Sequence, residues 1–313
     1  WPPTLHQHGT HLIYVRQGEC EDYLMRQSDP IDEFSVNRGL AVKMLPYNIT
    51  VPPDKMSLKQ YDVPVNGGAL TQYPSQGGYI FQGTSRRAYY PVGKASDAGW
   101  KNNSNINTGG TEVCPPGYRR PADGPTGTSG EVLKSEMRQS FWLKPKNGKA
   151  QSNYDNMLRG YLADGYFDRR PIRVPNTQGH TDEGQDVYSQ EPAFTIGSTT
   201  YGPFTVPTMV GEGAEVAFAG MLLYNPYTYA SVFVPGTGSR FGQFSFGALE
   251  EGRLIGTGAQ SNLWTSTISG GSMWYLATGY YLSSSGSGSS FVFDNYQSIP
   301  GMEGFSVRCV RDI

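Results

Sequence analysis

Hydrophobic and polar residues alternate along several short segments of the chain, and this period of two is typical of half-buried β-strands. The clearest cases are His11–Arg16 near the start and Gly304–Arg311 at the end. A helical period occurs in one place, where Leu133, Met137 and Phe141 form a single apolar stripe. The pattern therefore predicts many short strands and one convincing helix.

The expected helix has recognisable ends. Thr128 and Glu131 have the spacing of a capping box, in which two side chains satisfy backbone N–H groups of the first turn. At the other end, Lys144-Pro145 stops the helix because proline cannot continue it. We therefore expect helical structure between these two points.

Pairs of Gly and Pro interrupt the chain from Asp29 to about Gly110, and only short apolar pieces such as Gly78–Phe81 lie between them. This stretch of sequence is typical of irregular β structure or of an extended connector. The Asn-rich stretch Lys101–Gly110 can bury little apolar surface and is a candidate boundary. We expect an irregular β-rich region or connector at 1–110 and a second domain at 111–313.

The composition limits the partners of the chain. The formal net charge of 313 residues is -2 and the pI is about 6.1, so no overall charge attracts nucleic acid or anionic lipid. No apolar run approaches the roughly 18 to 20 residues that a membrane-spanning helix needs, and Trp1-Pro2-Pro3 does not open a signal peptide. With 40 Gly, 22 Pro and 21 Tyr, we expect a soluble, loop-rich, mature or trimmed chain with no transmembrane segment and no nucleic-acid partner.

Three cysteines, Cys20, Cys114 and Cys309, lie far apart in the sequence. They include no C-x-x-C pair, so neither a zinc ribbon nor a thioredoxin-type site is expected. A long-range disulfide with one thiol left over fits this count.

Four segments occur in the order Cys114–Pro121, Ser231–Gly238, Leu263–Thr267 and Gly304–Asp312. They resemble the four signatures of the Fibrobacter succinogenes major paralogous domain, a family abundant in Bacteroidetes surface proteins and often found after fimbrillin-like domains. Two earlier segments look like those that precede the domain in fimbrillin-associated members: Tyr14–Glu19 and Tyr73–Gln76. Because the family is similar to C-type lectins, the resemblance implies an α+β fold. It would contain a C-type-lectin-like domain with short twisted antiparallel strands, one or two helices and long loops, after an irregular β-rich N-terminal region.

The resemblance also implies a disulfide. If the opening segment and the closing strand of the domain lie side by side, Cys114 and Cys309 come within reach of each other. Closing so long a loop would contribute roughly 5 kcal/mol by chain entropy, and an oxidising compartment would favour the bond. Two buried free thiols are the alternative.

The segment Ser261–Ser290 is dominated by Ser, Gly, Tyr and Trp, which is the composition of antibody paratopes. It is therefore the candidate ligand-binding face, with Trp264, Met273, Trp274, Tyr275, Tyr280, Tyr281 and Tyr296. We expect Trp264 and Leu276 to point inward and Tyr280, Tyr281 and Tyr296 to point outward; the alternative is that alternate aromatic residues are simply core. The tract also resembles the variable region of retroelement-diversified proteins, which display such residues on an exposed face.

No metal and no cofactor are expected. Sugar-binding C-type lectins use Glu-Pro-Asn or Gln-Pro-Asp with Trp-Asn-Asp to hold calcium, and here Ala193 follows Glu191-Pro192 while Thr265 follows Trp264. We interpret Asp182, Glu183 and Asp186 as a solvated acidic loop. We interpret His6, His8 and His11 as part of a frayed terminus.

An enzyme is an alternative from a different class. Gly304–Arg311 also resembles the end of formylglycine-generating enzymes, which rely on a reactive cysteine pair, but no second cysteine lies near Cys309 in the sequence. The carboxylates Asp164 and Asp168 have no fixed separation across a sugar, and no nucleophile-elbow motif is present. We expect no catalytic residues.

These observations together favour an extracellular recognition or adhesion protein at the cell surface, at the tip of a fimbria or pilus. The closing strand takes up the last residues, so none remain to complement a neighbouring subunit. The expected partners are a protein or glycan ligand on a host or microbial surface, and pilus subunits. A phage receptor-binding variable protein is a further alternative.

Overall fold

The computed structural model describes part of the 313-residue chain. The described residues are 22–25, 40–83, 85–91, 100, 112–122, 136–137, 160–163, 188–191, 194–196, 199–201, 204–207, 209–210, 216–218, 220–224, 231–241, 252–255, 260–269, 272–282, 289–298 and 303–312. Side-chain burial is described for a subset of them.

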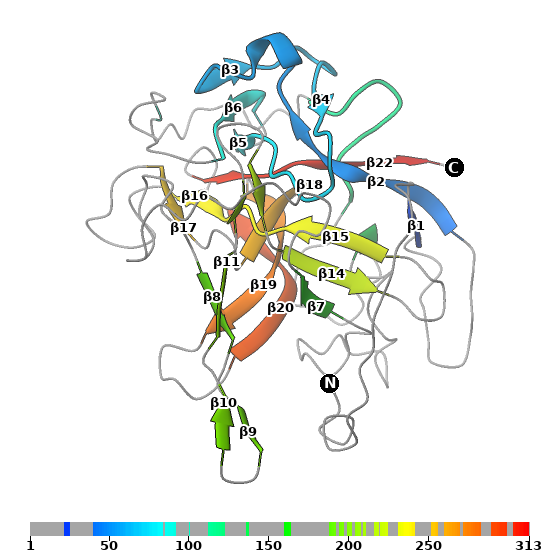
Figure 1. The fold of residues 1–313 in the computed structure, drawn as a ribbon. Coiled ribbons are helices and arrows are strands. Elements are labelled where there is room, and N and C mark those ends of the chain that lie inside the picture. Colours follow the sequence, from blue (N-terminus) through cyan, green and yellow to red (C-terminus); the bar gives the residue numbers. More distant parts are fainter. Residues whose placement is uncertain are drawn as a thin grey trace.

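Two sheets join early and late parts of the chain (Figure 1). The first has the order β1-β2-β22, with β4 paired to the end of β2: β1 (Asp22–Met25), β2 (Leu40–Thr50), β4 (Ala69–Leu70) and β22 (Arg308–Asp312). The second has the order β17-β16-β21-β5-β6-β3: β17 (Arg253–Ile255), β16 (Ser239–Phe241), β21 (Gly304–Phe305), β5 (Ile80–Gln82), β6 (Arg87–Tyr89) and β3 (Gln60–Asp62). A single 3-10 turn, η1 (Pro53–Lys55), precedes β3. Because β22 pairs with β2 and β21 with β5, the end of the chain lies in both sheets.

The other described strands form smaller antiparallel groups. The longest are in a three-stranded sheet, β18 (Gln260–Ser269), β19 (Ser272–Leu282) and β20 (Ser289–Ser298). A second group of three is β15 (Ser231–Pro235), β14 (Gly220–Tyr224) and β7 (Gly160–Ala163). Three pairs complete the set: β8 (Tyr188–Glu191) with β11 (Phe204–Pro207), β9 (Phe194–Ile196) with β10 (Thr199–Tyr201), and β12 (Met209–Val210) with β13 (Ala217–Phe218).

This architecture corrects the expected α+β fold. Regular structure in the described residues is nearly all β, so a C-type-lectin-like domain with one or two helices is wrong as a description of it. Of the expected helix, only Glu136 and Met137 are described, and both have helical backbone. The physical reason is that alternation and turn residues cover most of the sequence, whereas the helical stripe is short. The expected helices depended mainly on the resemblance.

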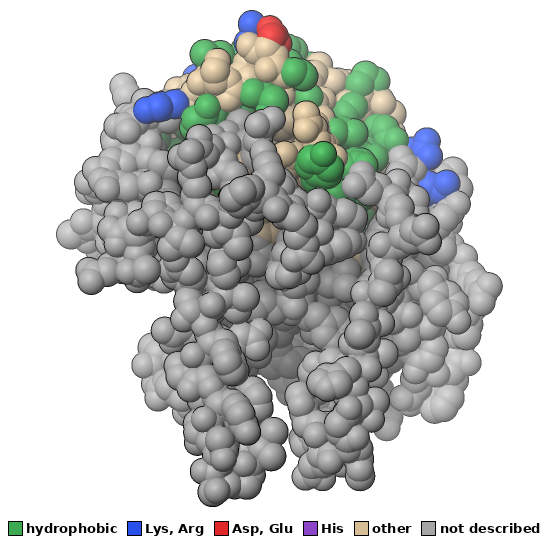
Figure 2. Space-filling view, viewed as in Figure 1, with side chains coloured by type: hydrophobic (Ala, Val, Ile, Leu, Met, Phe, Trp, Pro, Cys, Tyr) green, Lys and Arg blue, Asp and Glu red, His purple; other side chains and the backbone are tan. Residues whose placement is uncertain are grey.

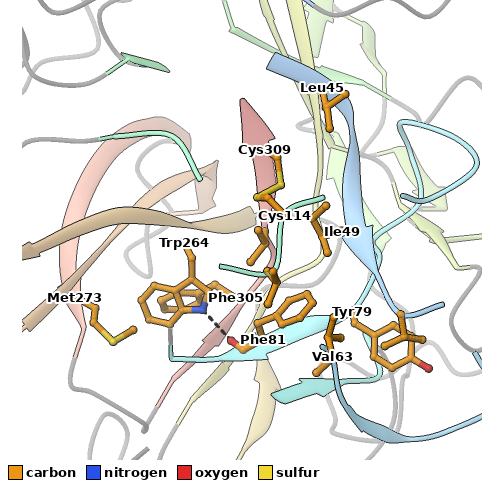
Figure 3. Packing of buried hydrophobic residues seen from close by; sticks show 14 residues of the cluster. Leu45, Ile49, Val63, Tyr79, Phe81, Cys114, Trp264, Met273, Phe305 and Cys309 are labelled. Atoms are coloured by element: carbon orange, nitrogen blue, oxygen red, sulfur yellow. Dashed lines mark hydrogen bonds between the residues drawn. A yellow bond between two sulfur atoms is a disulfide. The ribbon is translucent and has the colours of Figure 1, made fainter. Parts of the chain in front are cut away.

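One hydrophobic core draws on residues from both sides of position 110 (Figure 3). The Trp264 ring lies 4.4 Å from the ring of Phe305, and its indole Nε1–H donates a 2.8 Å hydrogen bond to the carbonyl of Phe81. The buried members are Leu45, Ile49, Val51, Val63, Tyr79, Phe81, Ala88, Val113, Cys114, Trp264, Met273, Phe305, Val307 and Cys309. The division at residue 110 stays a prediction, but the described residues before it pack into this shared core.

Buried hydrogen bonds connect three of the four signature-like segments. The hydroxyls of Thr237 and Ser306 lie 2.8 Å apart, and the backbone N–H of Trp264 donates to the carbonyl of Ser306 at 3.0 Å. The Arg308 guanidinium donates to the carbonyl of Phe233. Each of these buried groups gains a partner from a distant segment, so the segments hold one another in place.

The closing strand expected at Gly304–Arg311 is confirmed as β21 and β22. The strand expected at His11–Arg16 and the boundary at Lys101–Gly110 lie outside the described residues. Within the described part of the chain, no helix has the length and apolar character needed to cross a bilayer.

Candidate recognition surface

A buried disulfide anchors the start of the signature-like region. Cys114 and Cys309 are bonded, with their Cα atoms 5.9 Å apart and a sequence separation of 195. This is the pairing that the resemblance implies. Both side chains are fully buried, and Cys309 belongs to β22, so the opening segment is covalently fixed to a core strand.

The carboxylate of Glu112 organises the opening segment. Its Oε1 accepts hydrogen bonds from the backbone N–H groups of Val113 at 2.8 Å and Cys114 at 3.0 Å, and its Oε2 accepts one from the N–H of Arg120 at 3.1 Å. The Arg120 side chain lies 3.5 Å from the same carboxylate and is almost completely buried. Burial lowers the pKa of Arg120, and the charge of Glu112 opposes that shift. One carboxylate therefore fixes both ends of the segment.

A second carboxylate holds the next part of the segment. Glu136 accepts both arms of the Arg119 guanidinium, at 2.7 and 2.9 Å, and the backbone N–H of Ala122 at 2.7 Å. The backbone of Arg119 is also bonded in both directions to Val310 of β22. A two-pronged, charge-assisted contact of this kind restricts geometry strongly. Residues 112–122 thus form a fixed platform.

A tight turn at Pro64–Gly67 is attached to this platform. The N–H of Gly67 donates to the carbonyl of Pro64 at 3.0 Å, and Asn66 has a φ of 53°. Such a left-handed residue is normally Gly or Asn, because other side chains are disfavoured there. The N–H of Asn66 donates to the carbonyl of Glu112 at 3.0 Å, so the turn is held rigidly beside the opening segment.

Large apolar side chains on and after this turn are exposed to solvent. Val65 is 57% exposed, Leu70 38% and Tyr73 41%. Leu70 lies in β4, which pairs with β2, and the N–H of Tyr73 donates to the Gln76 side chain at 3.1 Å. Figure 2 shows hydrophobic side chains on the upper right of the molecule, in the region of β4 and of the loop that Figure 1 draws beyond it. We call Val65, Leu70 and Tyr73 the loop surface.

The other end of the platform meets an irregularity in β18. The pairing of β18 with β19 shifts between Trp264 and Ile268, and the N–H of Ser266 donates to the carbonyl of Pro121 at 3.0 Å. Bulges of this kind often redirect side chains at the edges of functional sites. Ser266 is exposed and Ile268 is 45% exposed, so this bulge displays a mixed polar and apolar rim.

The residues expected to form the binding face differ in burial. Trp264, Met273 and Trp274 are buried, with exposed fractions of 0%, 0% and 3%, so they are core residues and not a displayed face. Tyr275 is partly buried and packs against Trp264 and Phe305. The expected inward positions of Trp264 and Leu276 are confirmed by burial. The reason is that both faces of the middle of β19 are covered.

Tyr280, Tyr281 and Tyr296 belong to β19 and β20, but their side chains lie outside the described ones. The register places Tyr296 opposite Tyr275. Because Trp264, Met273 and Trp274 are buried, the seven residues do not form one displayed face, and the outward positions of these three tyrosines stay predictions.

The remaining candidate groups fall outside the described residues: the histidine group at His6, His8 and His11, the acidic loop at Asp182, Glu183 and Asp186, and the carboxylates Asp164 and Asp168. In the described part of the chain, no cluster of His, Cys, Asp and Glu could hold a metal ion.

Comparisons of the chain with protein-family models, with curated proteins and with solved structures found no match.

The sequence analysis did not predict the loop surface. Tyr73 appears there only as part of a family-like segment, and Val65 and Leu70 look like ordinary strand or turn residues. One signal was present, because Val65-Asn66-Gly67 follows Pro64 as a turn sequence, and an apolar residue inside an exposed turn is left without a core to enter.

Proposed function

We propose that the chain is an extracellular recognition protein that binds a protein partner at a cell surface, in a fimbria or pilus-tip setting. The observation that carries the proposal is the loop surface. Val65, Leu70 and Tyr73 stay exposed. The turn that carries Val65 is hydrogen-bonded to the disulfide-anchored segment, Leu70 lies in β4, which pairs with β2, and the N–H of Tyr73 donates to the Gln76 side chain. A preorganised surface loses little conformational entropy on binding, and exposed apolar side chains favour a contact with protein.

The disulfide supports the extracellular part of the proposal. Disulfides persist in oxidising compartments and are rare where thiols are kept reduced. The resemblance of four segments to the Fibrobacter succinogenes major paralogous domain, a family of surface proteins, points the same way. Three of these segments share buried hydrogen bonds, and the fourth is joined to the closing strand by the Cys114–Cys309 bond.

The state of Cys309 favours binding over the enzyme alternative. Formylglycine-type chemistry requires a reactive thiol, whereas here the sulfur of Cys309 is bonded to Cys114 and fully buried. Labelling the folded protein with a thiol reagent tests this. We expect Cys114 and Cys309 to react only after reduction and unfolding, and labelling of Cys309 in the native, unreduced protein would favour the enzyme.

Binding is tested with arrays of surface proteins and of glycans, probed with the intact chain. We expect a protein ligand whose signal falls at least tenfold in Tyr73→Ala and in Leu70→Ala. Leu58→Ala is the matched control, because Leu58 is 42% exposed on the separate loop after η1. Unchanged circular dichroism must accompany each variant.

The same arrays separate the rival surfaces. Loss of signal in Tyr280→Ala and Tyr281→Ala, with full binding by the loop variants, would move the site to the β19–β20 end. A ligand found only on the glycan array would replace the protein partner, and no signal on either array would count against recognition itself.

A further inference from the structure

The Cys114–Cys309 bond divides the chain into a closed loop and two arms. The bond spans a sequence separation of 195 residues, and both cysteines have no exposed surface. The segment 261–298, which holds the expected recognition tract, lies inside the chain enclosed by the disulfide. The loop surface at 65–73 lies in the long N-terminal arm. A pull along the chain therefore acts differently on the two regions.

From the N-terminal side, the pull first meets β1, which pairs with β2 from Asp22–Met44 to Met25–Leu40. Once β1 has separated, the pull reaches the ladder between β2 and β22. The two strands are antiparallel, and Val42 pairs with Asp312 at one end while Asn48 pairs with Arg308 at the other. Tension applied before β2 and after β22 enters the ladder at the Val42–Asp312 end. Its hydrogen bonds then break one after another and not all together, so the ladder is easily opened.

Opening of the ladder reaches Cys309 after Asp312, Arg311 and Val310 have separated from β2 and from Arg119. At that point the covalent bond passes the load from Cys309 directly to Cys114. The chain between them is no longer in the path of the force, although the long arm before Cys114 still is.

We propose that the Cys114–Cys309 bond is a mechanical stop that shields the region between the two cysteines from tension along the chain. The N-terminal arm, including β2 to β6, can extend under load, and the looped region cannot. The proposed binding surface of Val65, Leu70 and Tyr73 lies in the arm and is not shielded, so the stop is independent of the proposed function.

The length withheld by the bond follows from the sequence separation. At about 3.5 Å per extended residue, a separation of 195 residues corresponds to about 680 Å of chain. The 119 residues at 1–114 and 309–313 correspond to about 420 Å. Full extension of the chain thus occurs in two parts of very different length.

Single-molecule force spectroscopy tests the proposal, with handles at both ends of the intact 313-residue chain. Without reductant we expect extension to stop near the shorter length. With dithiothreitol in the bath, a thiolate attacks one sulfur and releases the other, and a second step of about 680 Å should follow. Because both cysteines are buried, this second step should appear only after the first extension.

Two results would overturn the proposal. One is full extension, about 1,100 Å, in the absence of reductant. The other is a withheld length near 330 or 1,000 Å, which would show that Cys20 is bonded to Cys114 or to Cys309 instead. Cys20→Ser should leave the second step unchanged. Loss of the second step in this variant would also show that Cys20 takes part in the disulfide, and it would overturn the proposal.

A double variant, Cys114→Ala with Cys309→Ala, should extend in full without reductant. If it does not fold, the reductant-dependent step of the wild-type chain decides the question alone. The array experiment is independent of both. A chain that withholds about 680 Å yet binds nothing keeps the stop and refutes the recognition function.

Discussion

The hydrogen bond from Trp264 to Phe81 joins the late part of the chain to the early part, and its contribution can be isolated. The indole Nε1–H donates to the Phe81 carbonyl at 2.8 Å, and the Trp264 side chain is fully buried. Trp264→Phe removes the donor and leaves a buried carbonyl without its partner. That loss costs about 1–3 kcal/mol, and the smaller ring costs a further 1–2 kcal/mol or so through reduced packing. We expect a total near 3–4 kcal/mol.

Trp100 provides a matched control for the same chemical change. It is 5% exposed and packs on Tyr89, but its Nε1–H has no acceptor among the described residues. Trp100→Phe therefore removes ring atoms without breaking a hydrogen bond, and it relieves a buried donor that lacks a partner. We expect a loss of about 1–2 kcal/mol, so the two variants should differ by about 2 kcal/mol.

The assay is equilibrium unfolding in urea followed by far-ultraviolet circular dichroism, with the free energy obtained by linear extrapolation. The slopes of the two variants must agree, so that their midpoints can be compared. Losses equal to within about 0.5 kcal/mol would refute the claim that the Trp264–Phe81 bond contributes beyond packing.

Three further predictions use the same assay. Gly304→Ala should cost about 1–3 kcal/mol, because a Cβ there would lie 2.8 Å from the Trp100 ring and 2.9 Å from Ile80, and Trp100→Leu should recover part of the loss. Glu136→Gln should cost about 2–3 kcal/mol by weakening its contacts with Arg119 and Ala122, whereas Asp62→Asn, in an exposed pair with Arg87, should cost under about 1 kcal/mol. Burial raises the pKa of Tyr89 from 10.0 to about 12, so the folded state favours the neutral phenol. Because the unfolded phenol ionises near pH 10 and the folded one only near pH 12, the free energy of unfolding should fall by up to about 3 kcal/mol as the pH rises from about 10 to 12, and Tyr89→Phe should flatten that decline.

Local sequence patterns predicted the parts of the fold that are fixed by local physics. Alternation identified β21 and β22, and aromatic burial was anticipated for Trp264. The pairing of Cys114 with Cys309 came from the resemblance and not from any pattern. These successes depend on short segments, where a residue's neighbours in sequence determine which face it occupies.

The pairing of strands could not be predicted in the same way. Residues 42 and 312 are neighbours in a sheet although almost the whole chain separates them, and no local feature of β2 specifies β22 as its partner. The burial of Met273 and Trp274, which were candidates for the binding face, could not be assigned from the sequence for the same reason, since the segments that cover β19 come from elsewhere. Burial of an aromatic strand depends on tertiary packing, which composition does not reveal.

The dependence of the core on the last residues leads to a final prediction. Phe305, Val307 and Val310 are fully buried, and burial of three such side chains contributes roughly 5–9 kcal/mol. A whole domain is usually stable by only about 5–15 kcal/mol, so deletion of 304–313 should abolish cooperative unfolding, with the disulfide lost as well.

A shorter deletion is the control for this truncation. Removing only Asp312-Ile313 breaks one register pair at the end of β22 and leaves Cys309 and the buried residues in place, so a cooperative transition should persist. Thermal melts of both deletions, compared with the intact chain, check the reasoning. If the longer deletion melted as cooperatively and at the same temperature as the intact chain, the residues before 304 would form a stable core without the closing strands. The core would then not depend on Phe305, Val307 and Val310, and the Cys114–Cys309 bond would not be needed to hold it together.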